Sequence, residues 1–169
     1  MKVVKIKIYR FSELSERSKE NAFAHFRRDQ TLAFHVADEI IYSVRAFCKT
    51  FGIKLKSINL DDSLFHVDYP QLNDPGRETV GEFLSSRLPK GDCPFTGVCW
   101  DETLLDSVRP CLSDTSIDSD VLRSVLDDSL YAICRVYQDE VIYIYGDEAL
   151  SDLIESNDYE FTADGSIYG

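Results

Sequence analysis

The clearest periodic pattern in the sequence is helical and covers residues 35–51. Gly52 follows it directly, at the place where a helix commonly ends in the left-handed conformation. Apolar side chains recur there at every third or fourth residue, the period of an amphipathic helix: Ala37, Ile40, Ile41, Val44, Phe47, Cys48 and Phe51. The pattern predicts a helix that buries Ile40 and Phe47.

The N-terminal segment has a different period. Residues 3–11 alternate between apolar and mostly basic positions, which predicts a half-buried strand. Ser12 or Ser15 can cap a helix after it, because a short hydroxyl side chain accepts from free backbone N–H groups. We expect that helix over 16–29, with three residues buried on one face: Ala22, Phe23 and Phe26.

Two strands are predicted next, over 53–60 and 64–69, with the polar cluster 61–63 as their hairpin turn. In the second strand alternate residues should face the core: Phe65, Val67 and Tyr69. A short helix over 78–86 and a further strand over 95–100 are expected in the less regular middle of the chain.

The C-terminal third reads as mostly helical, over 101–109 and then from about 118 onward. The β-branched and aromatic run 141–145 leaves a strand there as an alternative. Asp147 can cap a last helix to about 156, before a short strand and turn in YEFTADG. These elements predict one α+β domain over residues 1–169, a small antiparallel sheet packed with several helices.

The chain should be a cytoplasmic protein. It has no apolar run of about 18 residues, and the N-terminus lacks the features of a signal peptide. The five cysteines are odd in number and widely spaced, which favours reduced thiols in a reducing compartment: Cys48, Cys93, Cys99, Cys111 and Cys134. Neither they nor the histidines show the close ligand pairs of a zinc site, so we expect no metal and no cofactor.

Charge is distributed unevenly along the chain. Residues 1–100 contain 15 Lys and Arg against 13 Asp and Glu, a net charge of +2. Residues 101–169 contain 3 against 17, a net charge of −14, which accounts for the total of −12. The acidic C-terminal third (101–169) makes direct binding to nucleic acid unfavourable and suits a basic partner.

Three segments carry a family resemblance. They are KIYRFSELSERSKENA near the start, GDCPFTG in the middle and DEALSDLIESNDYEFTADG at the end. In this order they resemble a family of small phage proteins that are often labelled antitoxin-like. In this chain Ser18, Lys90 and the pair Cys93–Pro94 depart from the family pattern. The resemblance implies a binding protein with no catalytic role.

The residues themselves also argue against an enzyme. No phosphate-binding loop, nucleophile elbow, metalloprotease helix or dinucleotide glycine pattern is present. Acidic clusters such as Asp61–Asp62 are typical of solvated loops and helix caps. The GDCPFTG loop is interpreted as a tight turn, in which Gly91 and Gly97 supply backbone freedom and Asp92 bonds its own chain, and a functional loop is the alternative.

Carboxylates repeated along helices can imitate the phosphate rows of DNA. The candidate partner-binding residues are Asp114, Asp118, Asp120, Asp127, Asp128, Asp139, Glu140, Asp147, Glu148, Asp152 and Glu155, with Asp158 and Glu160 close by. The sequence hypothesis is a phage-derived, non-enzymatic inhibitor of a host defence complex that handles nucleic acid, such as a CRISPR effector or a restriction system. The alternative is an antitoxin-like or regulatory module that binds a toxin.

Overall fold

The fold is given by a computed structural model that describes residues 6–72, 79–91, 93–97, 99–113 and 117–168. The chain divides into two compact units, and each is described by itself. Unit 1 combines both ends of the chain, residues 1–34 and 140–169, and unit 2 is residues 35–139. The prediction of one domain over the whole chain stays a prediction.

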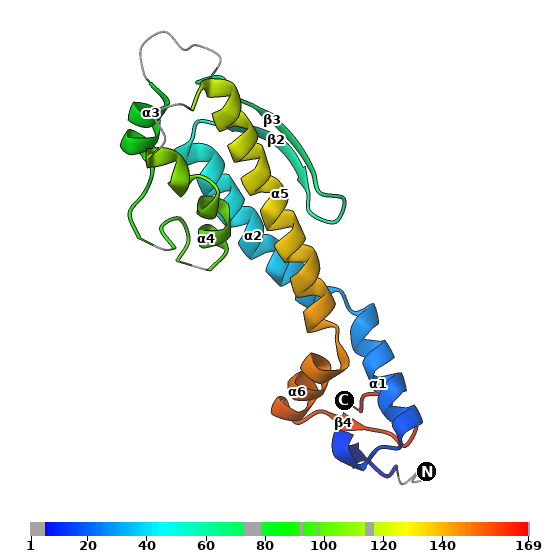
Figure 1. Cartoon of the computed structure of the whole chain (residues 1–169). Coiled ribbons are helices and arrows are strands. Elements are labelled where there is room, and N and C mark those ends of the chain that lie inside the picture. The colour runs from blue at the N-terminus through cyan, green and yellow to red at the C-terminus, as the bar shows by residue number, and fades with distance from the viewer. Residues whose placement is uncertain (1–5, 73–78, 92, 98, 114–116, 169) are drawn as a thin grey trace. The chain divides into compact units, whose positions relative to one another are not determined.

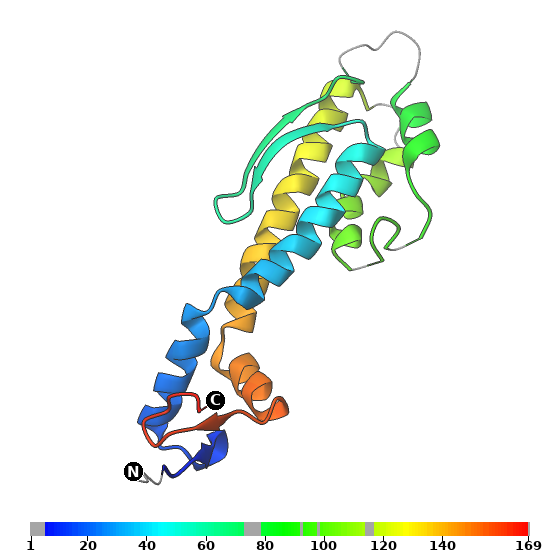
Figure 2. The same cartoon turned by 180° about the vertical axis from the view of Figure 1, so that it is seen from behind.

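The elements are shown in Figure 1, and from behind in Figure 2. In chain order they are β1 (Tyr9–Arg10), the 3-10 turn η1 (Phe11–Glu13), α1 (Glu16–Arg28), α2 (Thr31–Thr50), β2 (Lys54–Asn59), β3 (Leu64–Asp68), α3 (Val80–Arg87), α4 (Trp100–Asp106), the 3-10 turn η2 (Arg109–Ser113), α5 (Ser119–Ile144), α6 (Asp147–Ser156) and β4 (Glu160–Phe161). Helices and small antiparallel sheets in one chain confirm the α+β class. In the described ranges, no helix combines the length and the apolar character needed to cross a bilayer.

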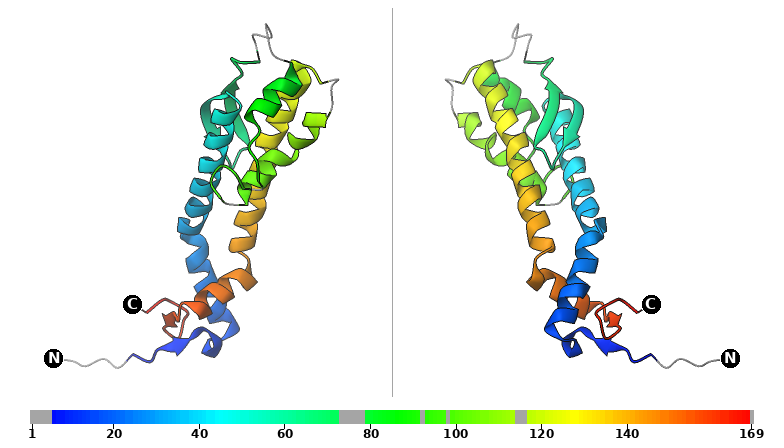
Figure 3. Two further views of the ribbon diagram at one scale, coloured as in Figure 1. Left: turned by 90° about the vertical axis from the view of Figure 1, so that its left-hand side faces the viewer. Right: turned by 90° about the vertical axis from the view of Figure 1, so that its right-hand side faces the viewer.

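Unit 1 is closed by pairing between the two ends of the chain (Figure 3). Strand β1 pairs antiparallel with β4, so that Tyr9 lies opposite Phe161. The strand predicted over 3–11 is thus limited to Tyr9–Arg10 among the described residues, and Ile6 and Ile8 before it are exposed rather than half-buried. Helices α1 and α6 pack beside this pair, and their apolar side chains share one core. Its fully buried members include Ala22, Leu150, Ile154 and Phe161.

Helix α1 begins where the sequence predicts. The Ser15 hydroxyl oxygen accepts the backbone N–H of Ser18 at 3.2 Å, so Ser15, and not Ser12, is the cap. The three residues expected on its buried face are buried. The ring of Phe23 packs 5.2 Å from that of Phe11, which ties α1 to the 3-10 turn η1.

The C-terminal turn of unit 1 is pressed against α1 at Gly165. An added Cβ there would lie 2.0 Å from the Ser18 carbonyl oxygen, and the φ of Gly165 is +88°. We expect Gly165→Ala to lower the free energy of unfolding by about 2 kcal/mol or more, because both the backbone conformation and the contact oppose a side chain. Chemical denaturation measures the loss.

Gly81→Ala in α3 is the matched control, because no atom lies within 4 Å of its added Cβ. Its stability should be unchanged or higher by up to about 1 kcal/mol, since alanine favours helix. Equal stabilities for the two alanine variants would contradict the close packing of Gly165 on α1.

In unit 2 the helices α2 and α5 lie side by side, with the β2–β3 ribbon along one side and α3 and α4 along the other (Figure 1). Helix α2 begins at Thr31 rather than at residue 35, because the Asp29 carboxylate accepts the N–H of Thr31 at 3.0 Å and caps an earlier turn. Ile40 and Phe47 are fully buried, and Gly52 has a φ of +64°, as the sequence predicts.

The hairpin follows its predicted alternation. Phe65 and Val67 are half-buried and Tyr69 is buried, whereas His66 and Asp68 are exposed. The two strands pair antiparallel with one irregularity, at Lys56, where Leu55 faces Val67 and Ser57 already faces His66. A bulge of this kind increases the local twist of the ribbon.

Four expectations about the middle and end of the chain need correction. Asp147 does not cap the last helix, because Gly146 is the N-cap of α6 and Asp147 is its first helical residue. Residues 95–100 are not a strand, because the chain turns through Thr96 and Gly97 and α4 begins at Trp100. The helix expected over 101–109 ends at Asp106, and Pro110 follows in a 3-10 turn that suits its missing N–H. The run 141–145 continues α5 to Ile144, so the strand alternative is wrong.

Candidate functional site

The predicted carboxylates are divided between the two units. Unit 2 contains five of them, Asp118, Asp120, Asp127, Asp128 and Asp139. The other predicted carboxylates that the structure describes belong to unit 1. Asp114 lies outside the described residues. The acidic C-terminal third is therefore shared between two units, and each set has its own surroundings.

In unit 1 the acidic end of the chain meets the basic N-terminal segment. Arg10 donates to the Asp158 carboxylate at 2.8 Å, and Arg27 forms an ion pair with Asp147. Unit 1 contains 8 Lys and Arg against 12 Asp and Glu, a net charge of −4, and unit 2 contains 10 against 18, a net charge of −8. The charge separation along the sequence is thus much reduced within the fold.

Several candidates on α5 have partners inside the chain. The Asp118 carboxylate accepts the N–H groups of Asp120 and Val121 at 3.0 and 2.9 Å, and so caps the helix. Asp120 pairs with Arg123 at 3.2 Å. These two carboxylates help to hold their own helix, as capping and charge pairing within a helix commonly do.

Asp127 also has a structural partner. Its half-buried carboxylate accepts the hydroxyl of Tyr69. Burial and then the Asp127 carboxylate raise the pKa of Tyr69, so the phenol remains a protonated donor. Asp127 therefore connects α5 to the end of β3.

The remaining candidates are exposed carboxylates with no ion pair among the described residues: Asp128, Asp139, Glu148, Asp152 and Glu155. Glu140 is half-buried on α5. On α5, Asp128 and Asp139 are separated by about 16 Å at 1.5 Å per residue. On α6, Glu148, Asp152 and Glu155 follow at spacings of four and three residues, which places them on one helix face at axial steps of about 6 and 4.5 Å.

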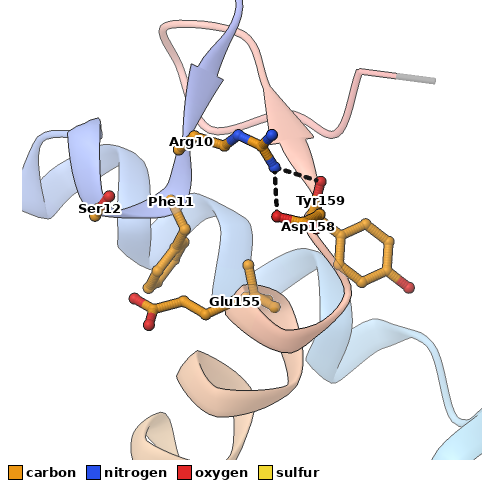
Figure 4. A pocket seen from close by; sticks show the side chains of 7 residues that line it. Arg10, Phe11, Ser12, Glu155, Asp158 and Tyr159 are labelled. Atoms are coloured by element: carbon orange, nitrogen blue, oxygen red, sulfur yellow. Dashed lines mark hydrogen bonds and ion pairs between the residues drawn. The ribbon is translucent and has the colours of Figure 1, made fainter.

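A shallow pocket of about 290 Å³ adjoins the end of this row. Figure 4 shows Arg10 directed at Asp158 on one side and the Glu155 carboxylate on the other side of the Phe11 ring. The pocket combines a free carboxylate, an aromatic wall and the negative C-terminal end of α6. This combination suits a cationic side chain, because the aromatic wall can contact its aliphatic stem and the negative groups can bind its charged end.

The sequence reasoning missed Asp101, the one buried carboxylate among the described residues. It accepts the N–H groups of Phe95 and Thr96, both at 2.7 Å, and the Thr96 hydroxyl at 3.0 Å. Burial alone would raise its pKa, but hydrogen bonds led by the Ser43 hydroxyl and the Thr96 N–H outweigh it and lower the pKa of Asp101 below the ordinary value. The sequence did offer a signal for this role, because Asp101 follows the GDCPFTG loop by a few residues and lies in the first turn of a predicted helix.

The hydrogen bonds of Asp101 also explain the conformation of the GDCPFTG loop. Gly91 and Gly97 have φ values of +100° and +80°, which confirms the interpretation as a turn. The prediction that Asp92 bonds its own chain concerns a residue outside those that the structure describes. With Asp101 bound to its backbone, the loop is an internal structural element of unit 2.

The cysteines are free thiols, and Cys48, Cys111 and Cys134 are buried. Burial raises the pKa of Cys48 to about 12 and that of Cys134 to about 11, so neither is a reactive thiolate near neutral pH. Over the described part of the chain, no three His, Cys, Asp or Glu side chains are grouped to hold a metal ion.

Comparison of the chain with protein-family models, curated proteins and solved structures finds no match.

Proposed function

We propose that this chain is a phage-derived, non-enzymatic inhibitor that binds a host defence complex, of the CRISPR or restriction type, at its basic nucleic-acid-binding surface. One observation carries the proposal. The α6 row of Glu148, Asp152 and Glu155 is exposed, lies on one face of the helix and has no ion pair with a cation among the described residues.

Electrostatics explains why such a row favours a partner. Like charges three or four residues apart on a helix repel and lower its stability by about 0.2 to 0.5 kcal/mol per pair. Asp152 and Glu155 add to this cost, because they lie toward the negative end of the helix dipole. A basic surface that normally binds phosphates would relieve this repulsion. The attraction between opposite charges would also steer the two proteins together and raise the association rate.

The proposal assigns different roles to the acidic residues. Asp118, Asp120 and Asp127 hold α5, and Asp147 and Asp158 hold the two ends of the chain together. The α6 row and, on unit 2, Asp128 and Asp139 remain for the partner. Mimicry of DNA is therefore proposed for a short row of carboxylates and not for the entire third.

The test is a charge reversal of the α6 row, Glu148→Lys, Asp152→Lys and Glu155→Lys, which changes the net charge by +6. The variant should fold, because these side chains are exposed. Binding to the partner should weaken by about 100-fold or more, since close interfacial charge pairs contribute well over 1 kcal/mol each. Titration calorimetry at two salt concentrations measures it.

The matched control carries the same +6 at exposed carboxylates of unit 2 that the proposal does not use, Asp61→Lys, Glu102→Lys and Asp106→Lys. The affinity of this control for the partner should fall by less than about tenfold, because only the long-range electrostatic field of the protein changes. Equal losses in the two variants would contradict a local role for α6. Binding that is insensitive to both reversal and salt would favour the alternative, a toxin-binding module with an apolar interface.

A further inference from the structure

A groove of about 560 Å³ in unit 2 runs between β3 and α5. Its β3 wall is formed by the consecutive residues 65–69, and its α5 wall includes Asp127, Leu130 and Tyr131. Successive side chains of a strand point to opposite faces. A groove lined by five consecutive residues must therefore follow the edge of the strand and not one of its faces.

This edge of β3 has no neighbouring strand. The sheet contains β2 and β3 only, so each strand has one edge without a partner strand in the described part of the chain. Proteins commonly protect such edges with lysines and bulges. The β2 edge has both, in Lys54 and Lys56 and the irregularity at Lys56, whereas β3 contains no lysine and no bulge.

The groove is preformed, because β3 is fixed along α5 at three points. The Tyr69 hydroxyl donates to Asp127, and the rings of Phe65 and Tyr131 lie 6.1 Å apart in an edge-to-face contact. At the hairpin tip the Gln138 amide donates to the Asp61 carbonyl at 2.8 Å. A rigid strand edge beside a helix loses little entropy when an extended peptide binds.

We propose that this groove binds an extended peptide segment of a partner protein as a third strand on β3. Backbone groups of the peptide pair with the open edge, as in β-strand addition. Alternate apolar side chains of the peptide pack against Tyr131, which is exposed on α5.

Charge selects a basic segment. The charged side chains of both signs at the groove are already paired, Lys56 with Asp68 at 2.7 Å, Arg123 with Asp120 at 3.2 Å and Asp127 with the Tyr69 hydroxyl, so the net charge of the unit decides the preference. Unit 2 has a net charge of −8, so its field repels an acidic peptide and attracts a basic one. The basic character of the segment rests on the proposed function, whereas strand addition itself does not.

The probe is a capped peptide of eight residues that alternates valine and lysine, labelled with a fluorophore. Four analogues accompany it: one with glutamate for lysine, one with serine for valine, and a pair with N-methyl groups on either alternate register. We expect the valine–lysine peptide to bind, and each of the first two analogues to bind at least about tenfold more weakly. One N-methyl register should abolish most binding and the other should preserve it, because only alternate N–H groups face the β3 edge.

Tyr131→Ala tests the site on the protein. Tyr131 is 49% exposed, so the variant should fold, and a thermal melt checks this. Its affinity for the peptide should fall by about tenfold, and Val121→Ala, 47% exposed on the same helix but outside the groove, should bind normally. No binding, equal binding of the serine–lysine peptide, equal effects of the two N-methyl registers, or an unchanged Tyr131→Ala would each overturn strand addition. The α6 reversal variant should still bind the peptide within a few-fold, so failure of the proposed function and failure of this groove give different results.

Discussion

Ile40→Asp is expected to lower the free energy of unfolding by about 3 to 5 kcal/mol, since a carboxylate would be buried without a partner. Ile40 is fully buried on α2, as are Val44 and Phe47. None of the buried side chains around it is a cation, because the buried polar residues among those described are three serines and Asp101. Solvation of the new charge therefore requires that the core of unit 2 opens.

Chemical denaturation followed by circular dichroism measures this effect. Ile40→Val is the control and should cost about 0.5 to 1.5 kcal/mol, because it removes one methylene group and preserves the polarity. An unfolding midpoint of Ile40→Asp equal to that of the wild type would show that α2 does not bury this face.

Asp101→Asn is expected to cost about 3 kcal/mol, because a charged acceptor of three hydrogen bonds becomes a neutral amide with one oxygen. The amide oxygen can take the place of the carboxylate oxygen that accepts the N–H groups of Phe95 and Thr96, but it accepts them without a charge, and the amide nitrogen then faces the Thr96 hydroxyl. Glu102→Gln, exposed in the next position, is the control and should change stability by less than about 0.5 kcal/mol. Loss of the loop structure can be followed by proteolysis between residues 88 and 97.

The same carboxylate predicts a pH dependence. The pKa of Asp101 is lower in the folded chain than in the unfolded one, so the folded state favours the ionised form. The stabilisation is complete above the unfolded pKa of about 4 and is lost as the pH falls through the folded pKa. The wild type and Asp101→Asn should therefore converge in stability below about pH 4, and a constant difference between them at all pH values would contradict the assignment.

Local signals in the sequence predicted most of the elements. The period of apolar residues identified α1, α2 and α5, and Ser15 and Gly52 marked two helix ends. The alternation around Phe65 identified the hairpin. The predictions fail where tertiary contacts, and not local propensity, determine the conformation of the chain. The aromatic run 141–145 has strand propensity but continues a helix, and Asp101 holds Phe95 and Thr96 in a turn where a strand was predicted.

The candidate site could be predicted only in part. The sequence located the carboxylates but not their partners, because Arg10–Asp158 and Arg27–Asp147 join residues more than a hundred positions apart. Pairing of β1 with β4 brings the basic and acidic ends of the chain together. The carboxylates of the acidic C-terminal third therefore fall into two sets, one in each unit. The helical spacing of Glu148, Asp152 and Glu155 is the only feature of the sequence that indicates the exposed row on α6.

The most direct measurement is capture from a bacterial lysate on two columns, one with the wild type and one with the reversed variant Glu148→Lys, Asp152→Lys and Glu155→Lys. The proposed function predicts that the wild type retains a nucleic-acid-binding protein that duplex DNA or raised salt elutes, and that the variant does not retain it. Retention of the same protein by both columns, with elution insensitive to DNA and to salt, would contradict binding through the carboxylate row.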